Sequence, residues 1–143
     1  MIRLIVVGKI KKKELSVLID EYIKQMPDFL TIVELKDETI EKECLSIEKM
    51  LNRNNYLIVC YQNGEELDSI ELAKKIDNIQ TFHSHDIDFV VGGSDGVDER
   101  IKMKADMLLS FSKLTFSHQV FRLMLVEQIY RVKQILAGHP YHK

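Results

Sequence analysis

The chain has 143 residues, of which 45% are hydrophobic and 29% charged, a balance that predicts one globular domain over residues 1–143. The two cysteines, Cys44 and Cys60, follow no motif spacing, which argues against a disulfide scaffold and favours a reducing cytoplasm. No stretch approaches the roughly eighteen apolar residues of a membrane span, and the apolar start "IRLIVVG" lacks a signal-peptide layout.

The net charge of −2 is unevenly distributed along the chain. Residues 1–99 hold 12 Lys/Arg against 20 Asp/Glu, whereas residues 100–143 hold 8 against 2, together with three of the five histidines. A basic segment on an acidic body is consistent with a polyanion site, but equally with a solvated helix face.

Short apolar runs alternate with longer amphipathic stretches over the first two thirds of the chain. Near-continuous apolar runs predict strands at 2–8, 29–35, 55–61 and 86–93 that are buried on both sides. Apolar residues at helical spacing predict helices at 12–26, 38–53 and 69–82. This alternation predicts a parallel sheet with helices on its faces, and such sheets place ligands at the carboxyl ends of their strands.

The sharpest local motif is "FVVGGSDG", in which a buried strand runs into Gly92-Gly93 and then Ser94-Asp95-Gly96. Glycines let the backbone turn tightly and approach a ligand without an intervening Cβ. Neither the dinucleotide fingerprint G-x-G-x-x-G nor the P-loop pattern is present, and no acidic ribose ligand is evident downstream. A ligand cradle and a plain strand-to-helix turn both remain open at this point.

The stretch "LSFSKLTFSH" predicts a strand over Leu109–Phe116 whose end opens into a loop, with Ser117 as N-cap of a helix at 118–137. Glu127 and Arg131 are four residues apart on its polar face and predict an ion pair. The helix carries two apolar stripes, one more than a single sheet face needs, so either it is deeply buried or it covers a dimer interface. The stripes are Phe121, Leu125, Ile129, Val132, Leu136 and Val120, Leu123, Val126, Tyr130.

The chain ends in "GHPYHK", which taken alone could be a metal site, a tag, a loose end or part of an active site. His139 and His142 are three residues apart, but no third or fourth ligand accompanies them, and no H-E-x-x-H or C-x-x-C motif exists. We therefore expect no metal.

Taken together, "FVVGGSDG", "LSFSKLTFSH", "RLMLVEQIYR" and the terminal "HPYHK" resemble the ribosomal large subunit methyltransferase H family. The resemblance spans the whole chain, with the motifs in order and at matching spacing. It implies a SPOUT-class fold, a three-layer α/β/α parallel sheet with a C-terminal deep trefoil knot. It also implies a homodimer whose interface is formed by the knot and the final helix.

The resemblance implies methyl transfer from S-adenosylmethionine to N3 of a pseudouridine (pseudouridine 1915) in helix 69 of 23S rRNA. By position, the implied cofactor contacts are Cys60, Gly92, Gly93, Phe111, Ser112, Lys113, Leu114, Thr115 and Phe116. Tyr141 and His142, contributed by the partner subunit, are the implied catalytic candidates. RNA contacts are expected from His118, Arg122, Arg131, His139 and Lys143.

The chain departs from this family at three positions. Lysine stands at Lys143 in place of the usual arginine, which keeps the charge but loses the bidentate fork. Ser117 replaces a common proline, and Cys60 replaces a leucine, so Cys60 is expected to make a backbone or apolar contact. A Rossmann-like nucleotide-dependent enzyme, a knotted methyltransferase for another RNA and a non-catalytic RNA-binding module remain alternatives.

Overall fold

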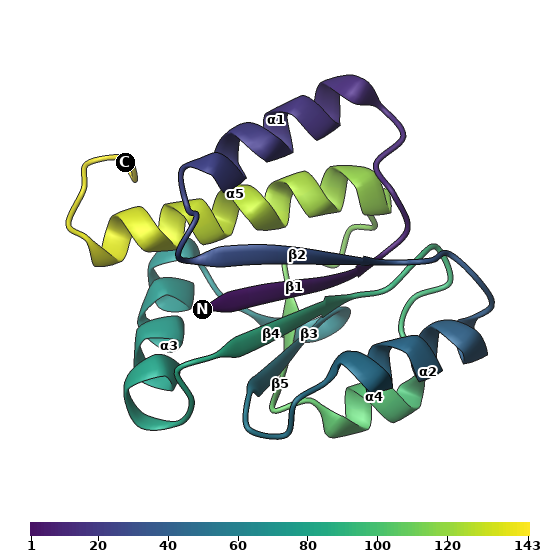
Figure 1. The fold of residues 1–143 in the computed structure, drawn as a ribbon. Helices are drawn as coiled ribbons and strands as arrows, with labels where there is room; N and C mark the ends of the chain where they lie inside the picture. Colours follow the sequence, from purple (N-terminus) through teal and green to yellow (C-terminus); the bar gives the residue numbers. More distant parts are fainter.

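A computed structural model describes residues 1–143 and shows five strands and five helices arranged around one sheet (Figure 1). The strands are β1 (Ile2–Val7), β2 (Leu30–Leu35), β3 (Tyr56–Glu66), β4 (Ile87–Val91) and β5 (Met107–Ser110). The helices are α1 (Lys13–Lys24), α2 (Ile40–Met50), α3 (Ser69–Phe82), α4 (Glu99–Lys104) and α5 (His118–Leu136). None of these helices has the length and apolar character needed to cross a membrane.

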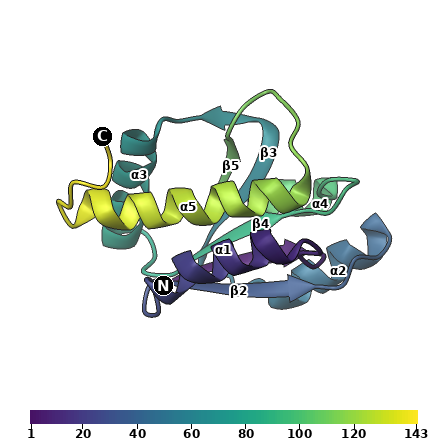
Figure 2. The same cartoon turned by 90° about the horizontal axis from the view of Figure 1, so that it is seen from above.

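The sheet has the strand order β2-β1-β4-β3-β5, and every pair of neighbouring strands is parallel. Helices α1, α3 and α5 cover one face, and α2 with the short α4 covers the other (Figures 1 and 2). The parallel three-layer architecture predicted from the sequence is therefore confirmed.

The strands divide their apolar side chains between two cores because successive residues of a strand point to opposite faces. In β1, Ile2, Leu4 and Val6 belong to the larger core under α1, α3 and α5, whereas Ile5 and Val7 belong to the smaller core under α2 and α4. All five side chains are at most 1% exposed. Burial on both faces explains the near-continuous apolar runs in the sequence.

Strand β3 runs five residues beyond its predicted end at residue 61. The strand bulges after Cys60 and then pairs again with β5, so that Leu109 stands opposite both Cys60 and Glu65. Figure 2 shows the curve of β3 beside β5. The hydroxyl of Ser110 donates to the carbonyl of Gln62 at 2.8 Å and fastens this crossing.

The crossing requires a glycine at position 64. A Cβ placed on Gly64 would lie 2.7 Å from the carbonyl carbon of Leu108, a distance that side chains do not tolerate. The backbones of β3 and β5 therefore approach each other more closely than any residue with a side chain allows.

Strand β5 is shorter than predicted. It ends at Ser110, and residues 111–117 form a loop rather than continuing the alternation to Phe116. The small polar residues of this stretch bond locally instead: the amide of Leu114 donates to the Ser112 hydroxyl at 3.0 Å. Serine side chains commonly offer the backbone this alternative to a strand ladder.

We predict that Gly64→Ala lowers the free energy of unfolding by about 1–3 kcal/mol, because the added methyl group forces β3 away from the Leu108 backbone. Urea unfolding measures the change. Asn63→Ala, at the exposed neighbouring position, is the matched control and should change stability by less than about 0.5 kcal/mol. Equal stability of the two variants would contradict a close crossing of β3 and β5.

Candidate active site

A cavity of about 690 Å³ opens at the carboxyl ends of β3, β4 and β5. Three segments that are distant in sequence line it: residues 60–62 after the straight part of β3, residues 91–97 after β4, and most of residues 111–118 between β5 and α5. Its size falls within the range of small-molecule sites. Its position agrees with the rule that open parallel sheets bind ligands beyond the ends of their strands.

The wall after β4 is a tight turn built from glycines. Gly93 and Gly96 form an antiparallel bridge, in which the Gly96 amide donates to the Gly93 carbonyl at 3.0 Å. Gly96 has φ +81°, and a Cβ on Gly92 would overlap the Gly96 backbone, 2.6 Å from its carbonyl carbon. The turn therefore presents bare backbone to the cavity, which a side chain at Gly92 would prevent.

The opposite wall is the loop between β5 and α5. Phe111 packs on Phe121 of α5 with ring centroids 4.8 Å apart, and the Gln62 side-chain amide donates to the carbonyl of Lys113. Ser117 caps α5 as predicted, its hydroxyl accepting from the Val120 amide at 3.3 Å. These contacts hold the loop across the mouth of β3 and give the cavity a defined shape.

The start of α5 is bound to the end of β1. Arg122 is 3% exposed; one of its guanidinium nitrogens donates to the Gly8 carbonyl at 2.7 Å, and another pairs with Glu34 at 2.5 Å. These bonds employ the guanidinium inside the protomer, although the sequence predicted an RNA contact for Arg122. The bonds attach the start of α5, and with it His118, to the end of β1. The RNA contact of Arg122 stays a prediction.

Burial controls the protonation of two groups around the cavity. The desolvated thiol of Cys60 has its pKa raised to about 12, so it remains a neutral thiol at physiological pH. This agrees with the apolar contact expected at this position. Beneath the glycine turn, burial likewise raises the pKa of Glu43, whose carboxylate accepts from the Glu38 amide at 2.8 Å and lies against Gly93.

Eight of the nine predicted cofactor residues line the cavity; Lys113 does not, and contributes only its carbonyl to the loop. His118, predicted to contact RNA, also lines it. The sequence reading missed Lys102 of α4, whose ammonium lies 4.1 Å from the ring centroid of Tyr61 at the cavity wall. No spacing pattern marks this pair, because α4 and β3 meet only in the fold.

The C-terminal tail lies at the other end of α5. The C-terminus lies at the opposite end of α5 from the cavity (Figures 1 and 2). The tail folds back along the helix as far as Glu127, about 13–14 Å along the axis from His118, and neither Tyr141 nor His142 lines the cavity. The predicted site residues at this end of the helix are Arg131, His139, Tyr141, His142 and Lys143. Within one chain, the structure does not bring these residues to the cavity.

The tail is nevertheless ordered against its own helix. The Tyr141 hydroxyl donates to Glu127 at 3.0 Å, and Arg131 contacts both Glu127 at 2.6 Å and the Nδ1 atom of His142 at 3.1 Å. Tyr141 also meets Tyr130 edge-on, with centroids 4.9 Å apart. Burial, followed by the neighbouring Tyr22 and Glu127, raises the pKa of Tyr141, so its phenol stays protonated and acts as a donor. The predicted Glu127–Arg131 pair is confirmed.

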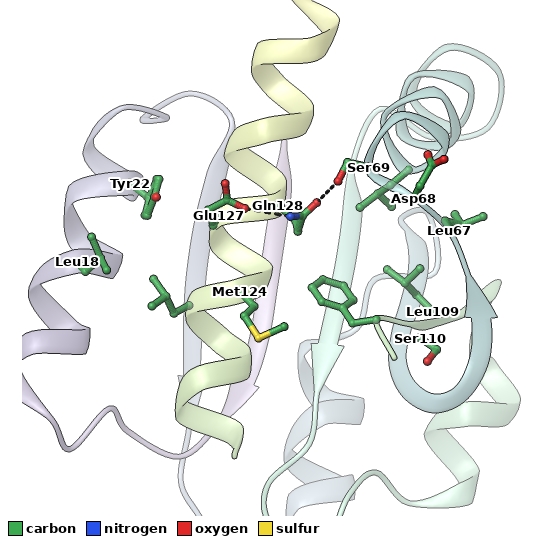
Figure 3. Close-up of a pocket in the computed structure, with 13 residues that line it drawn as sticks. Leu18, Tyr22, Leu67, Asp68, Ser69, Leu109, Ser110, Met124, Glu127 and Gln128 are labelled. Atoms are coloured by element: carbon green, nitrogen blue, oxygen red, sulfur yellow. Dashed lines mark hydrogen bonds between the residues drawn. The ribbon is translucent and has the colours of Figure 1, made fainter. Parts of the chain in front are cut away.

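A second hollow, of about 520 Å³, lies along α5 and shares Leu109 and Phe111 with the cavity. Figure 3 shows Leu18 and Tyr22 of α1 on one side of α5 and Ser69 at the start of α3 on the other. Its lining is mostly apolar, with a polar bridge in which the Ser69 hydroxyl donates to Gln128 at 2.7 Å. The second stripe of α5 is only partly covered: Val126 is buried, but Val120 is 42% exposed, and Leu123 lines this hollow.

No group of three or more His, Cys, Asp or Glu side chains is placed to bind a metal ion. His139 and His142 of the tail turn to separate partners: His139 accepts from the Tyr141 amide and His142 contacts Arg131.

Comparison with known proteins gives a consistent result. Residues 1–142 match the model of a family described as predicted SPOUT methyltransferase. The chain is 42% identical to a ribosomal RNA large subunit methyltransferase H of Acholeplasma laidlawii, over 99% of both chains. It is 40% identical to the protein of that name from Prochlorococcus marinus, over 99% of this chain and 94% of the relative. A Clostridium botulinum protein of the same name is 42% identical over 99% of both chains.

Proposed function

The chain belongs to the SPOUT methyltransferases, in the ribosomal RNA large subunit methyltransferase H family, and we propose that it methylates 23S rRNA. The proposed reaction moves a methyl group from S-adenosylmethionine to N3 of pseudouridine 1915 in helix 69. The relatives' names support an rRNA of the large subunit as the substrate. A substrate in the ribosome supports the cytoplasmic location that the proposal includes. The trefoil knot that the resemblance implies is part of the proposal, and the match to the SPOUT family model supports it.

The observation that carries the proposal is the cavity, because one hollow gathers eight of the nine residues expected to hold the cofactor. The lining suits such a molecule. Bare backbone at Gly92 and Gly93 allows close approach, and Cys60, Leu109 and Phe121 offer an apolar surface for a purine ring. The absence of a carboxylate in the ribose position of a Rossmann site is no obstacle, since backbone groups dominate this wall.

When bound there, S-adenosylmethionine supplies a methyl group on a positively charged sulfonium. The residues of this chain must then hold the base in line with that methyl group, which is mainly a task of positioning. The base loses its N3 proton in the reaction, so a nearby acceptor or positive charge lowers the barrier. His118 lies at the rim and Lys102 in the wall, and both are suitably placed for such electrostatic support.

We propose that the tail completes the site of a second subunit in a homodimer. In its own protomer the tail is bonded to Glu127 and Arg131 and does not line the cavity, so the proposal takes the tail at each cavity from the other copy. The contacts of the tail with Glu127 and Arg131 present it as a fixed surface, which lowers the entropic cost of docking. The partly covered hollow along α5 offers apolar area for the same interface.

We predict that Gly92→Ala weakens binding of S-adenosylhomocysteine by at least about tenfold, or ~1.4 kcal/mol, because its Cβ overlaps the Gly96 backbone. Isothermal titration calorimetry measures the affinity. Gly138→Ala is the control, since nothing lies within 4 Å of its added Cβ and the residue is outside the cavity; its positive φ, which Gly92 does not share, makes it a control for backbone strain alone.

Two results of this titration would count against the proposal. If the unaltered protein binds no S-adenosylhomocysteine but binds NAD or ATP, a Rossmann-like enzyme becomes the better reading. If Gly92→Ala binds normally while its thermal unfolding is unchanged, the glycine turn is not part of the cofactor site.

The substrate is tested with labelled S-adenosylmethionine and purified ribosomes. We expect label in 23S rRNA from ribosomes that carry pseudouridine in helix 69, and none in ribosomes from cells that lack this pseudouridine. Label in a different RNA would retain the methyltransferase and refute the substrate. Cofactor binding without transfer to any RNA would favour a non-catalytic binding module.

The shared site predicts complementation between two inactive proteins. Gly92→Ala has a damaged cavity and an intact tail, whereas deletion of residues 139–143 has the reverse, so we expect each alone to be inactive on ribosomes. Co-expressed as a mixed dimer, they should recover up to about half the activity per dimer, because one intact cavity meets one intact tail. Full activity of the deletion protein, or no recovery in purified mixed dimers, would show that the tail does not act across an interface.

A further inference from the structure

Four lysines crowd the connection between β1 and α1: Lys9, Lys11, Lys12 and Lys13, here called the lysine patch. All four are exposed, and none has a carboxylate within ion-pair distance. Only Glu14 offsets them locally. The start of α1 has no side-chain cap at Lys12, so its free amides add to the positive field.

This charge is exceptional in its part of the chain. Residues 14–99 hold 7 Lys/Arg against 20 Asp/Glu, so the patch is a concentration of positive charge within an acidic part of the sequence. It lies beside the basic segment 100–143, whose helix α5 packs against α1. Positive charge gathered in one place attracts and orients an approaching anion.

The patch is bound to the rim of the cavity by two sets of bonds. The amides of Lys11 and Lys12 donate to the side-chain oxygen of Gln119, at 3.0 and 3.4 Å. Gly8, just before the patch, donates its amide to Leu35 at 2.8 Å and accepts from Arg122 at 2.7 Å. Gly8 also faces the ring of His118, with its Cβ position 3.7 Å from Nε2.

These bonds leave the lysine side chains free. The connection uses only backbone amides and the Gly8 carbonyl to attach itself to α5, so its four ammonium groups are not engaged by these bonds. Its backbone adjoins the start of α5 at His118 and Gln119, so phosphates that approach the cavity across this connection meet positive charge. A lysine is a point charge on a flexible stem, suited to phosphates whose exact placement varies.

We propose that the lysine patch binds backbone phosphates of the RNA strand that carries the target nucleotide, and so guides that nucleotide to the cavity. The inference rests on the proposed function, since it names a further contact of the same substrate. Phosphate contacts of this kind fix the register of a nucleic acid, while the cavity selects the base.

The test replaces the four lysines with glutamine (K9Q, K11Q, K12Q and K13Q together). The bonds to Gln119 and Arg122 involve the backbone, so they survive. The control removes four positive charges elsewhere (K24Q, K49Q, R53Q and K74Q), at exposed residues that also lack ion pairs. Both variants change net charge by the same amount.

We expect the patch variant to raise KM for ribosomes by about tenfold to a hundredfold near 0.15 M salt, with kcat and S-adenosylhomocysteine affinity retained. The slope of log KM against log salt should become shallower by about two to three, because fewer counterions are released. The control variant should keep both the KM and the slope of the unaltered protein.

Several outcomes would overturn the inference. Unchanged KM and slope in the patch variant would do so, as would an equal loss in the control, which would reveal only a general effect of net charge. A fall in kcat alone, with KM retained, would assign the lysines to the chemical step. Failure of the unaltered protein to methylate ribosomes would instead refute the proposed function. In that case, RNA binding is measured directly for both variants, and weaker binding by the patch variant alone would still support a phosphate-binding patch.

Discussion

The close crossing of β3 and β5 is the constraint on which the site depends. Gly64 lets the two backbones approach, and the return of β3 to Leu109 turns residues 60–62 toward the glycine turn after β4. Without that return, β3 would simply stop after Cys60. The loop after β5 would then have no segment facing it across the cavity. The path of the strands therefore shapes the cavity. Most of its lining residues contribute backbone and apolar surface, and few contribute charged groups.

A second consequence concerns distance. Helix α5 begins at the cavity and carries the tail away from it. Within one chain, the cavity lining and the tail are therefore apart, although the family resemblance assigns both to one active site. Buried Arg122 holds the near end by its bonds to Gly8 and Glu34, and Glu127 with Arg131 orders the far end. The helix therefore acts as a rigid spacer between a binding half-site and a half-site offered to another molecule.

Much of this was predictable because local patterns carry it. Alternating strands and helices, the Ser117 cap and the Gly92-Gly93 turn each depend on a few neighbouring residues, and the family motifs identified most of the cavity lining. The errors arose where distant segments meet. Neither the extension of β3 to Glu66 nor the burial of Arg122 against Glu34 leaves a mark in the adjacent sequence. The four lysines of the patch lie close together in the sequence, but the net charge of residues 1–99 is negative despite them.

Helix α5 follows the other nine elements along residues 1–143, and this bears on how the core is assembled. Leu125, Val126, Ile129 and Val132 cover the face formed by Leu72, Ile76 and Ile79 of α3, together with Ile19 of α1. Until residue 132 has left the translating ribosome, that face has no cover and remains exposed to water. The larger core therefore cannot be completed before α5 has joined the sheet.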